Sequence, residues 1–296
     1  MADSADVGLI VESVEAKETC NVDSGDTADA SIELSDVVDH VYEVEKVVRH
    51  ELDSYDAFVT GICALPTGNV VITDANNDKV KLLDKNYKVV DMCDIPKSPE
   101  DMCHIIDHEV AVAVREEDKR NEIRIIKAVR SEMCCVMVVK LHIECCYIAH
   151  NAGKFYVGSN DALWLYNLTG NLERKVYTGE MGRLAVSDNG ERIYILNGYD
   201  GRVVTLDNTG KLLAVFEDSR LIEPAGIAVT DNGSVLACGY QSDTVVQIDK
   251  EGTRLVAAIV KPSNEFCAPY HLCFNRKTRE LVVSYFGSFL HVLKLK

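Results

Sequence analysis

Residues 226–252 decide the fold of this chain, and they read GIAVTDNGSVLACGYQSDTVVQIDKEG. A short apolar run is followed by an Asp-Asn-Gly turn, a second apolar run, a polar loop, a third apolar run and a turn that ends in glycine. Valine and isoleucine favour strands, and Gly and Asn tolerate the positive φ that tight hairpins need. This stretch therefore predicts consecutive antiparallel strands.

The same order of elements recurs along the chain after residue 58, most clearly in residues 183–210 and 61–84. Matching positions in the first strands are 41, 43, 38, 43 and 45 residues apart, which is the period of a four-stranded propeller blade. These positions are Ile62, Cys103, Cys146, Leu184, Ile227 and Leu272. Six units fit. The sequence therefore predicts an all-β fold, a six-bladed β-propeller of four-stranded antiparallel blades over residues 44–296.

The sixth unit supplies only three strands before the chain stops. An unpaired blade edge is prone to aggregate, so we expect a valine-rich N-terminal strand around residues 44–51 to close the ring. Four valines in residues 37–48 also fall at helical spacing, as at the end of a coiled coil. That alternative would favour self-association, and the oligomeric state is left open.

The negative charge is concentrated at the N-terminus. Residues 1–53 carry a net charge of −12, out of −16 for the whole chain. Residues 1–40 are acidic and poor in large apolar side chains, which predicts a mostly disordered leader. Neither part has the basic excess that phosphate binding needs, so nucleic acid is an unlikely partner and RNA binding is the lesser alternative.

Targeting signals and cysteine spacing give further expectations. No stretch approaches the ~18 apolar residues of a membrane span, and the first residues do not resemble a signal peptide, so we expect a cytoplasmic chain with no membrane partner. The 11 cysteines include no C-x-x-C pair. We expect them to pack as small hydrophobic residues in the core.

The run ITDANNDKV at residues 72–80, with Asp84 closing the strand, resembles the NHL repeat. Residues 44–296 resemble the six-bladed propeller at the C-terminus of invertebrate tripartite-motif-like proteins. The resemblance implies recognition of proteins or RNA, while an upstream RING and B-box transfer ubiquitin. Only the first unit keeps the aspartate. A single cysteine before residue 60 does not suffice for a RING, so we expect no ubiquitin transfer by this chain, which is complete or the tail of a longer protein.

Propeller sites form where loops meet at one mouth of the central channel. We look at the mouth formed by the loops between second and third strands and by the connections between blades. The fourth to sixth units each place an aromatic residue in the first set of loops. These partner-binding candidates are Tyr199, Tyr240, Tyr285 and Phe286. Tyrosine suits protein recognition, and the alternative is that each ring packs on its own loop.

The competing prediction is a metal-dependent lactonase or phosphotriesterase, because the gluconolactonase-like family is also a six-bladed propeller. Oxygen ligands in the channel would hold a divalent cation. The candidate ligands are Asp101, Glu144, Glu223 and His271. Asp101 and Glu144 are expected at matching positions, just before the inner strands of the second and third units. The equivalent residues of the fourth and fifth units are Gly182 and Ala225, which cannot bind a cation through a side chain. That family's Glu-Gly-Pro signature is absent, so the main prediction is a non-catalytic module that binds a protein and has no cofactor.

Overall fold

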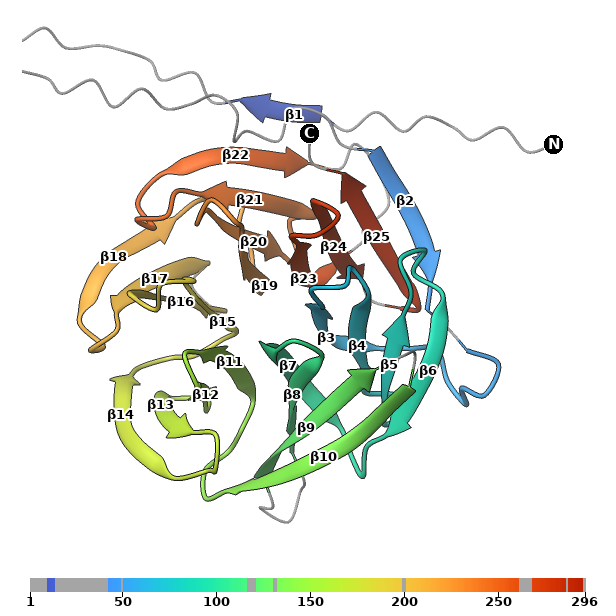
Figure 1. Ribbon diagram of the computed structural model, residues 1–296. Helices are drawn as coiled ribbons and strands as arrows, with labels where there is room; N and C mark the ends of the chain where they lie inside the picture. Colours follow the sequence, from blue (N-terminus) through green and yellow to red (C-terminus); the bar gives the residue numbers. More distant parts are fainter. Residues whose placement is uncertain are drawn as a thin grey trace, which may run out of the picture.

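The computed structural model describes residues 10–13, 42–48, 50–115, 121–129, 132–198, 201–260, 268–285 and 287–294. These residues form 25 β-strands joined by turns and loops. The strands make six sheets that stand as blades around a central axis, which confirms the predicted six-bladed all-β propeller (Figure 1). Over the described part of the chain, no helix has the length and apolar character needed to cross a membrane.

Each blade is a meander in which neighbouring strands are antiparallel and the first strand lies nearest the axis (Figure 1). Blade one contains β3 (Val59–Ala64), β4 (Val70–Asp74), β5 (Lys79–Leu83) and β6 (Val89–Asp94). Blade two contains β7 (Pro99–Ile106), β8 (Glu109–Val114), β9 (Asn121–Val129) and β10 (Glu132–Leu141). Blade three contains β11 (Tyr147–Asn151), β12 (Lys154–Gly158), β13 (Ala162–Asn167) and β14 (Leu172–Thr178).

The remaining blades follow the same order. Blade four contains β15 (Leu184–Val186), β16 (Arg192–Asn197), β17 (Arg202–Asp207) and β18 (Leu212–Glu217). Blade five contains β19 (Pro224–Val229), β20 (Val235–Gly239), β21 (Thr244–Ile248) and β22 (Leu255–Val260). Blade six contains β23 (Pro269–Asn275), β24 (Glu280–Tyr285) and β25 (Phe289–Lys294).

Blade six is completed by β2 (Tyr42–Val47), which runs antiparallel to β25 from the pair Tyr42–Lys294 to the pair Val47–Phe289. The predicted closing strand is thus confirmed, although it begins and ends earlier than residues 44–51. The helical alternative does not hold for this segment. A further strand, β1 (Ile10–Ser13), lies within the predicted leader and pairs with β22 at the outer edge of blade five.

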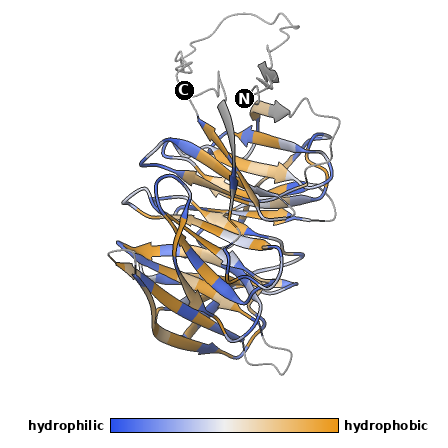
Figure 2. Cartoon of the chain, turned by 90° about the vertical axis from the view of Figure 1, so that its right-hand side faces the viewer, coloured by the Kyte–Doolittle hydropathy of each residue, from blue (hydrophilic) through white to orange (hydrophobic). Residues whose placement is uncertain are grey.

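The hydrophobic core lies between neighbouring blades. Val80 in blade one packs against Val112 and Ile126 in blade two, and all three are completely buried. Phe155 and Tyr166 fill the layer between blades two and three. Apolar residues lie mainly in the strands, while hydrophilic residues are frequent in the turns (Figure 2). Close packing of this kind holds the loops at both mouths in fixed positions.

The register of the inner strands corrects the predicted blade alignment. Blades one, two, five and six each have a bulge near the start of the inner strand, and blade three has none. The predicted match is displaced by one residue in blade two and by three residues in blade three. The positions that match Ile62 are therefore Met102 and Ala149, which pair with Val112 and Tyr156, and not Cys103 and Cys146.

The NHL-like run has a structural role in blade one. Asp74 accepts hydrogen bonds from Lys81 Nζ at 2.6 Å, from Asn77 Nδ2 at 2.8 Å and from the Phe58 amide at 3.1 Å. Lys81 also contacts Asp53 at 2.6 Å, and its side chain is fully buried. This network ties the segment that precedes β3 to the blade.

Candidate functional site

The predicted tyrosine loops are described only in part. Tyr199 and Phe286 lie outside the described residues. Tyr285 ends β24, and its ring centroid lies 4.2 Å from that of His291 on the neighbouring strand β25. This contact lies within blade six.

Tyr240, in contrast, belongs to a row of aromatic rings that crosses three blades. Its ring meets the edge of Tyr270 at a centroid distance of 6.3 Å, and Tyr270 lies 5.0 Å from Phe58. Tyr240 follows β20, Tyr270 lies in β23 and Phe58 precedes β3, so blades five, six and one each contribute one ring. Tilted and edge contacts at these distances are favourable for aromatic pairs.

Two exposed apolar side chains belong to the segments next to this row. Tyr55 is 66% exposed and Ile222 is 47% exposed. The carbonyl of Ile222 accepts from the amide of Gln241, next to Tyr240, and Tyr55 lies three residues before Phe58. We call the surface formed by Tyr55, Phe58, Ile222, Tyr240 and Tyr270 the aromatic face.

Sequence reasoning identifies only Tyr240 on this surface. Tyr270 escapes it because this residue is the bulged residue of β23, where the register skips from Pro269 to His271. Proline begins the inner strand in the same way in blades two, five and six, two residues before the register resumes. This Pro-x spacing is a signal that would have aligned these blades correctly.

Below the aromatic face, one register position of the inner strands forms a ring around the channel. In each blade it lies opposite the penultimate residue of the second strand. The six residues are Gly61, Asp101, Ile148, Arg183, Gly226 and His271. A Cβ at Gly226 would approach the His271 Cα to 2.9 Å, so a larger residue does not fit there.

Three members of the ring are charged or polar, and they come from alternate blades. His271 Nε2 lies 3.2 Å from Asp101 Oδ1, and Arg183 Nε lies 3.8 Å from the same oxygen. All three side chains are at least nine-tenths buried. We call Asp101, Arg183 and His271 the channel plug, because they meet across the channel from blades two, four and six.

The surroundings of the plug satisfy most of its polar atoms. Asp101 Oδ2 accepts from the Ile148 amide at 3.0 Å. Arg183 donates through Nη1 to the Ala225 carbonyl and through Nη2 to the Thr60 carbonyl, each at 2.8 Å. Its guanidinium also lies 4.6 Å from the centroid of the Tyr270 ring, a cation–π contact that joins the plug to the aromatic face.

Burial and neighbouring charges set the protonation of the plug. Burial lowers the pKa of His271, although the hydrogen bond to Asp101 acts in the opposite direction. Burial alone would lower the pKa of Arg183, but Asp101 and Tyr270 outweigh it and raise this pKa. The imidazole of His271 is therefore neutral at pH 7, beside the charged guanidinium of Arg183.

The structure brings together two of the four candidate metal ligands, Asp101 and His271. Glu144 and Glu223 are exposed, and they accept hydrogen bonds from Asn160 and Gln241 respectively. Glu144 does not match Asp101 in position, because Asp101 lies inside β7 whereas Glu144 precedes β11. Within the described ranges, no three His, Cys, Asp or Glu side chains gather closely enough to hold a metal ion.

In blade four, the residue that matches Asp101 is Arg183, whereas sequence spacing predicts Gly182 at this position. The carbonyl of Arg183 accepts from Leu196, the penultimate residue of β16, so Arg183 is the residue in register with Asp101. Its guanidinium lies beside the carboxylate that a cation would need.

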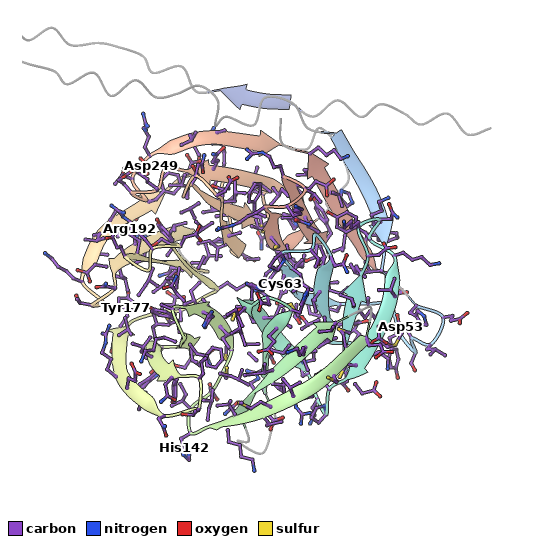
Figure 3. The ribbon with its side chains drawn as sticks, viewed as in Figure 1. Asp53, Cys63, His142, Tyr177, Arg192 and Asp249 are labelled. Atoms are coloured by element: carbon purple, nitrogen blue, oxygen red, sulfur yellow. The ribbon has the colours of Figure 1, made fainter. Side chains whose placement is uncertain are left out.

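The cysteines of the described part of the chain are free thiols. Cys145 and Cys238 are fully buried, as expected for core residues. The expectation is wrong for Cys134 and Cys135, which are exposed on β10 at the rim of blade two. Cys63 lies near the centre of the propeller, whereas His142 and Asp249 lie at its outer rim (Figure 3).

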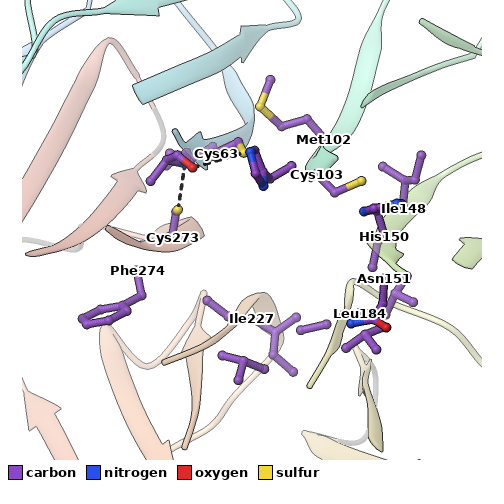
Figure 4. Close-up of a pocket in the computed structure, with 18 of the residues that line it drawn as sticks. Cys63, Met102, Cys103, Ile148, His150, Asn151, Leu184, Ile227, Cys273 and Phe274 are labelled. Atoms are coloured by element: carbon purple, nitrogen blue, oxygen red, sulfur yellow. Dashed lines mark hydrogen bonds between the residues drawn. The ribbon is translucent and has the colours of Figure 1, made fainter. Parts of the chain in front are cut away.

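On the other side of the plug lies a cavity of about 810 Å³. Every lining residue belongs to the ring position or follows it along the chain, up to the turns that join first and second strands. Cys63 and Cys273 lie across an open space from Leu184, and Cys103 lies beside Ile148 and His150 (Figure 4). The cavity thus lies toward the mouth opposite the aromatic face.

Comparisons with known proteins support the fold. No family model matches the chain, and no curated protein matches its sequence. Among solved structures, a luciferin-regenerating enzyme is similar with a TM-score of 0.65 and 12% identity, over 86% of this chain and 95% of that one. A streptogramin B lyase gives 0.60 and 12%, over 86% and 98%. Virginiamycin B lyase from Staphylococcus aureus gives 0.61 and 11%, over 87% and 100%. At these identities the likeness shows the propeller fold alone.

Proposed function

We propose that this chain is a non-catalytic recognition module that binds a protein partner through the aromatic face. The observation that carries the proposal is the continuous contact of Phe58, Tyr270 and Tyr240 across three blades. Tyr55 and Ile222, on the segments next to this row, are exposed to solvent. The resemblance of residues 72–80 to the NHL repeat agrees with a recognition role.

Aromatic side chains suit the centre of a protein interface. Tyrosine buries a large area while losing only two torsions, and interface hot spots are enriched in it. The three rings already contact one another, and Tyr270 also contacts Arg183, so little conformational freedom is left to lose on binding. A preformed surface of this kind binds by exchanging water for a partner's apolar side chains.

The charge around the face indicates what the partner carries. Glu51, Asp56 and Glu223 are exposed and belong to the same segments as Tyr55, Phe58 and Ile222. The whole chain has a net charge of −16. We therefore propose a partner segment with an apolar centre and a basic rim, since complementary charge speeds association and selects the partner.

A displayed library of random peptides tests the proposal with the partner still unidentified. Peptides are selected on the full chain and retested on the double variant Ile222→Ala/Tyr240→Ala. The matched control is Leu172→Ala/Leu212→Ala, which removes two exposed leucines from the outer strands β14 and β18. We expect the selected peptides to contain both basic and apolar residues, to bind the control variant and to lose their affinity for the double variant. Peptides that bind both equally would refute the aromatic face.

A metal-dependent hydrolase is the second candidate, and the contact between Asp101 and His271 favours it. Calcium or zinc that binds only the folded state at ~100 times its dissociation constant should stabilise it by ~2.7 kcal/mol. We expect the melting temperature with either metal to equal that of a sample treated with a chelator. A shift that Asp101→Ala abolishes would move the assignment to the hydrolase and to lactone assays.

A further inference from the structure

The outer strands of blades one and two bring two cysteines to one interface. β6 and β10 hold the same place in successive blades and are neighbours at the rim of the propeller (Figure 1). Cys93 lies on β6 and is half-buried, and Cys135 lies on β10 and is exposed. Neither residue belongs to the aromatic face, the channel plug or the cavity. The pair is therefore independent of the proposed function.

The strand register places both thiols on the face where the two blades meet. Cys93 lies opposite Val80, and Cys135 lies opposite Ile126. Val80 and Ile126 are completely buried in the core between these blades, and Cys93 packs against that core. Because directly opposite residues of an antiparallel pair extend from the same face of the sheet, the two cysteines continue this core toward the rim.

A hydrogen bond fixes how the two strands are aligned. Asp91 Oδ2 accepts from the Met133 amide at 2.5 Å, which joins β6 to β10. Each is the fourth strand of its blade, so both run in the same direction. Cys93 and Cys135 each follow two residues after this contact, and two residues advance either strand by about 6.6 Å. The two cysteines therefore lie at the same level along the interface.

The surroundings of Cys93 agree with this alignment. Burial raises the pKa of the Cys93 thiol, the Cys135 thiol raises it further, and a hydrogen bond from the Cys135 amide lowers it. The Cys93 thiol donates to the Asp94 carbonyl at 3.7 Å, and the Cys135 thiol donates to the Met137 carbonyl at 3.5 Å. A thiol is a weak donor, so both sulfurs can rotate toward each other at little cost.

We propose that Cys93 and Cys135 form a modification site, which a hydroperoxide converts into a disulfide between blades one and two. Hydrogen peroxide oxidises the exposed Cys135 thiol to a sulfenic acid, and one water leaves. The Cys93 thiol then attacks the sulfenic sulfur, the S–S bond forms and a second water leaves. The two thiols together lose two electrons and two protons, and the peroxide is reduced to two waters.

Cys134 provides a matched control within the same strand. It is adjacent to Cys135 and is also exposed, but it lies opposite Lys127. Successive residues of a strand point to opposite faces of the sheet, so Cys134 faces away from blade one. Its thiol should therefore not pair with Cys93.

Mass spectrometry of the full chain tests the inference. The chain is treated with hydrogen peroxide, its remaining thiols are alkylated, and it is cleaved after lysine and arginine without reductant. We expect residues 89–97 and 131–140 to be joined, in a species two hydrogens lighter than the two peptides together. Fragmentation should find the alkyl group on Cys134. Cys134→Ser should keep the cross-link, whereas Cys135→Ser should lose it.

The melting temperature connects the bond to the interface. The disulfide closes a loop over residues 93–135, so oxidation should raise the melting temperature by ~5–10 °C, and a thiol reductant should reverse the rise. A cross-linked chain that melts no higher than the reduced chain would refute a bond built into this interface.

Three further results would overturn the inference. In the first, Cys93 is still alkylated after treatment with a large excess of peroxide. In the second, Cys134 carries the bond, and in the third, the bonds join two copies of the chain. These results are read from the unmodified chain, so they decide the question even if a variant does not fold.

Discussion

The side chain of Asn77 holds the backbone of Tyr55 from both sides. Its Oδ1 accepts the Tyr55 amide proton at 3.0 Å, and its Nδ2 donates to the Tyr55 carbonyl at 3.0 Å. The same Nδ2 also donates to Asp74, which accepts from the Phe58 amide. The NHL-like run therefore fixes the two aromatic residues that blade one contributes to the aromatic face.

Replacing Asn77 by Ala should release Tyr55 and weaken binding at the aromatic face. Each hydrogen bond contributes about 1 kcal/mol, so we expect a modest loss of stability and a larger fractional loss of affinity for selected peptides. Asn76→Ala is the matched control, because Asn76 makes one hydrogen bond to the Asp56 carbonyl. Equal affinity for Asn77→Ala and the unmodified chain would show that Tyr55 is not needed.

Two lysines on β5 should differ sharply in their effect on stability. Lys81 is fully buried between Asp53 and Asp74, whereas Lys79 pairs with Asp94, whose side chain is 87% exposed. Removing one partner of a buried ion pair costs about 3–5 kcal/mol, while an exposed pair contributes about 0–1 kcal/mol. Urea denaturation should show this order for Lys81→Met and Lys79→Met. Similar midpoints would contradict the buried network.

The channel plug should stabilise the ring of blades. Asp101→Ala leaves Arg183 buried without its carboxylate, and we expect a loss of about 3–5 kcal/mol. Asp188→Ala removes an exposed carboxylate from Arg276 and should cost about 1 kcal/mol or less. Comparing their denaturation midpoints measures the difference, and an Asp101→Ala variant as stable as Asp188→Ala would mean that the plug does not hold the blades together.

Buried histidines should make the fold sensitive to acid. Burial lowers the pKa of His291 to about 4 and also lowers the pKa of His271 and His150. An unfolded histidine has a pKa of ~6.5, so below this pH the unfolded chain binds more protons than the folded chain. The free energy of unfolding should therefore fall as the pH drops from ~6.5 toward about 4. Above pH ~6.5 the contribution of the neutral histidines to stability is fully present. The melting temperature should follow this trend, and His291→Gln should flatten it. An unchanged slope in that variant would assign the effect to other groups.

Closure by β2 should matter more than the rest of the N-terminal segment. Deleting residues 1–41 leaves the pairing of β2 with β25 intact, whereas deleting residues 1–47 removes it and exposes the edge of β25. Losing several kcal/mol of strand pairing should lower the melting temperature by about 10 °C, at ~2–4 °C per kcal/mol. Two deletions with the same melting temperature would show that closure does not depend on β2.

The repeat of apolar runs and glycine turns is sufficient to predict the six blades and their closing strand. Periodicity predicts which residues form strands, and the missing strand of the sixth unit points to the N-terminus. The inner-strand register is not predictable in the same way, because bulges after Val59, Pro99, Pro224 and Pro269 add a residue that spacing alone does not reveal. Spacing also aligns Cys103, and not Met102, with Leu184, and this places Gly182, and not Arg183, in apparent register with Asp101.

The functional surface is predicted less completely for the same reason. Tyr240 lies in the loop between the second and third strands of its blade, and the repeat predicts this loop. Tyr270 and Phe58 precede the ring positions of their blades by different numbers of residues, so the repeat does not predict them. The contact between Asp101 and His271 joins residues 170 positions apart, and their neighbour Arg183 comes from a third blade. Such long-range contacts depend on the register of several blades at once.

The affinity of one selected peptide for Tyr240→Ala tests the central claim most directly. The dissociation constant is measured for the unmodified chain, for Tyr240→Ala and for Leu212→Ala, with melting temperatures taken in parallel. An interface hot spot contributes about 2 kcal/mol or more, so Tyr240→Ala should weaken binding about 30-fold with a nearly unchanged melting temperature. An unchanged dissociation constant in a folded Tyr240→Ala variant would contradict recognition through the aromatic face.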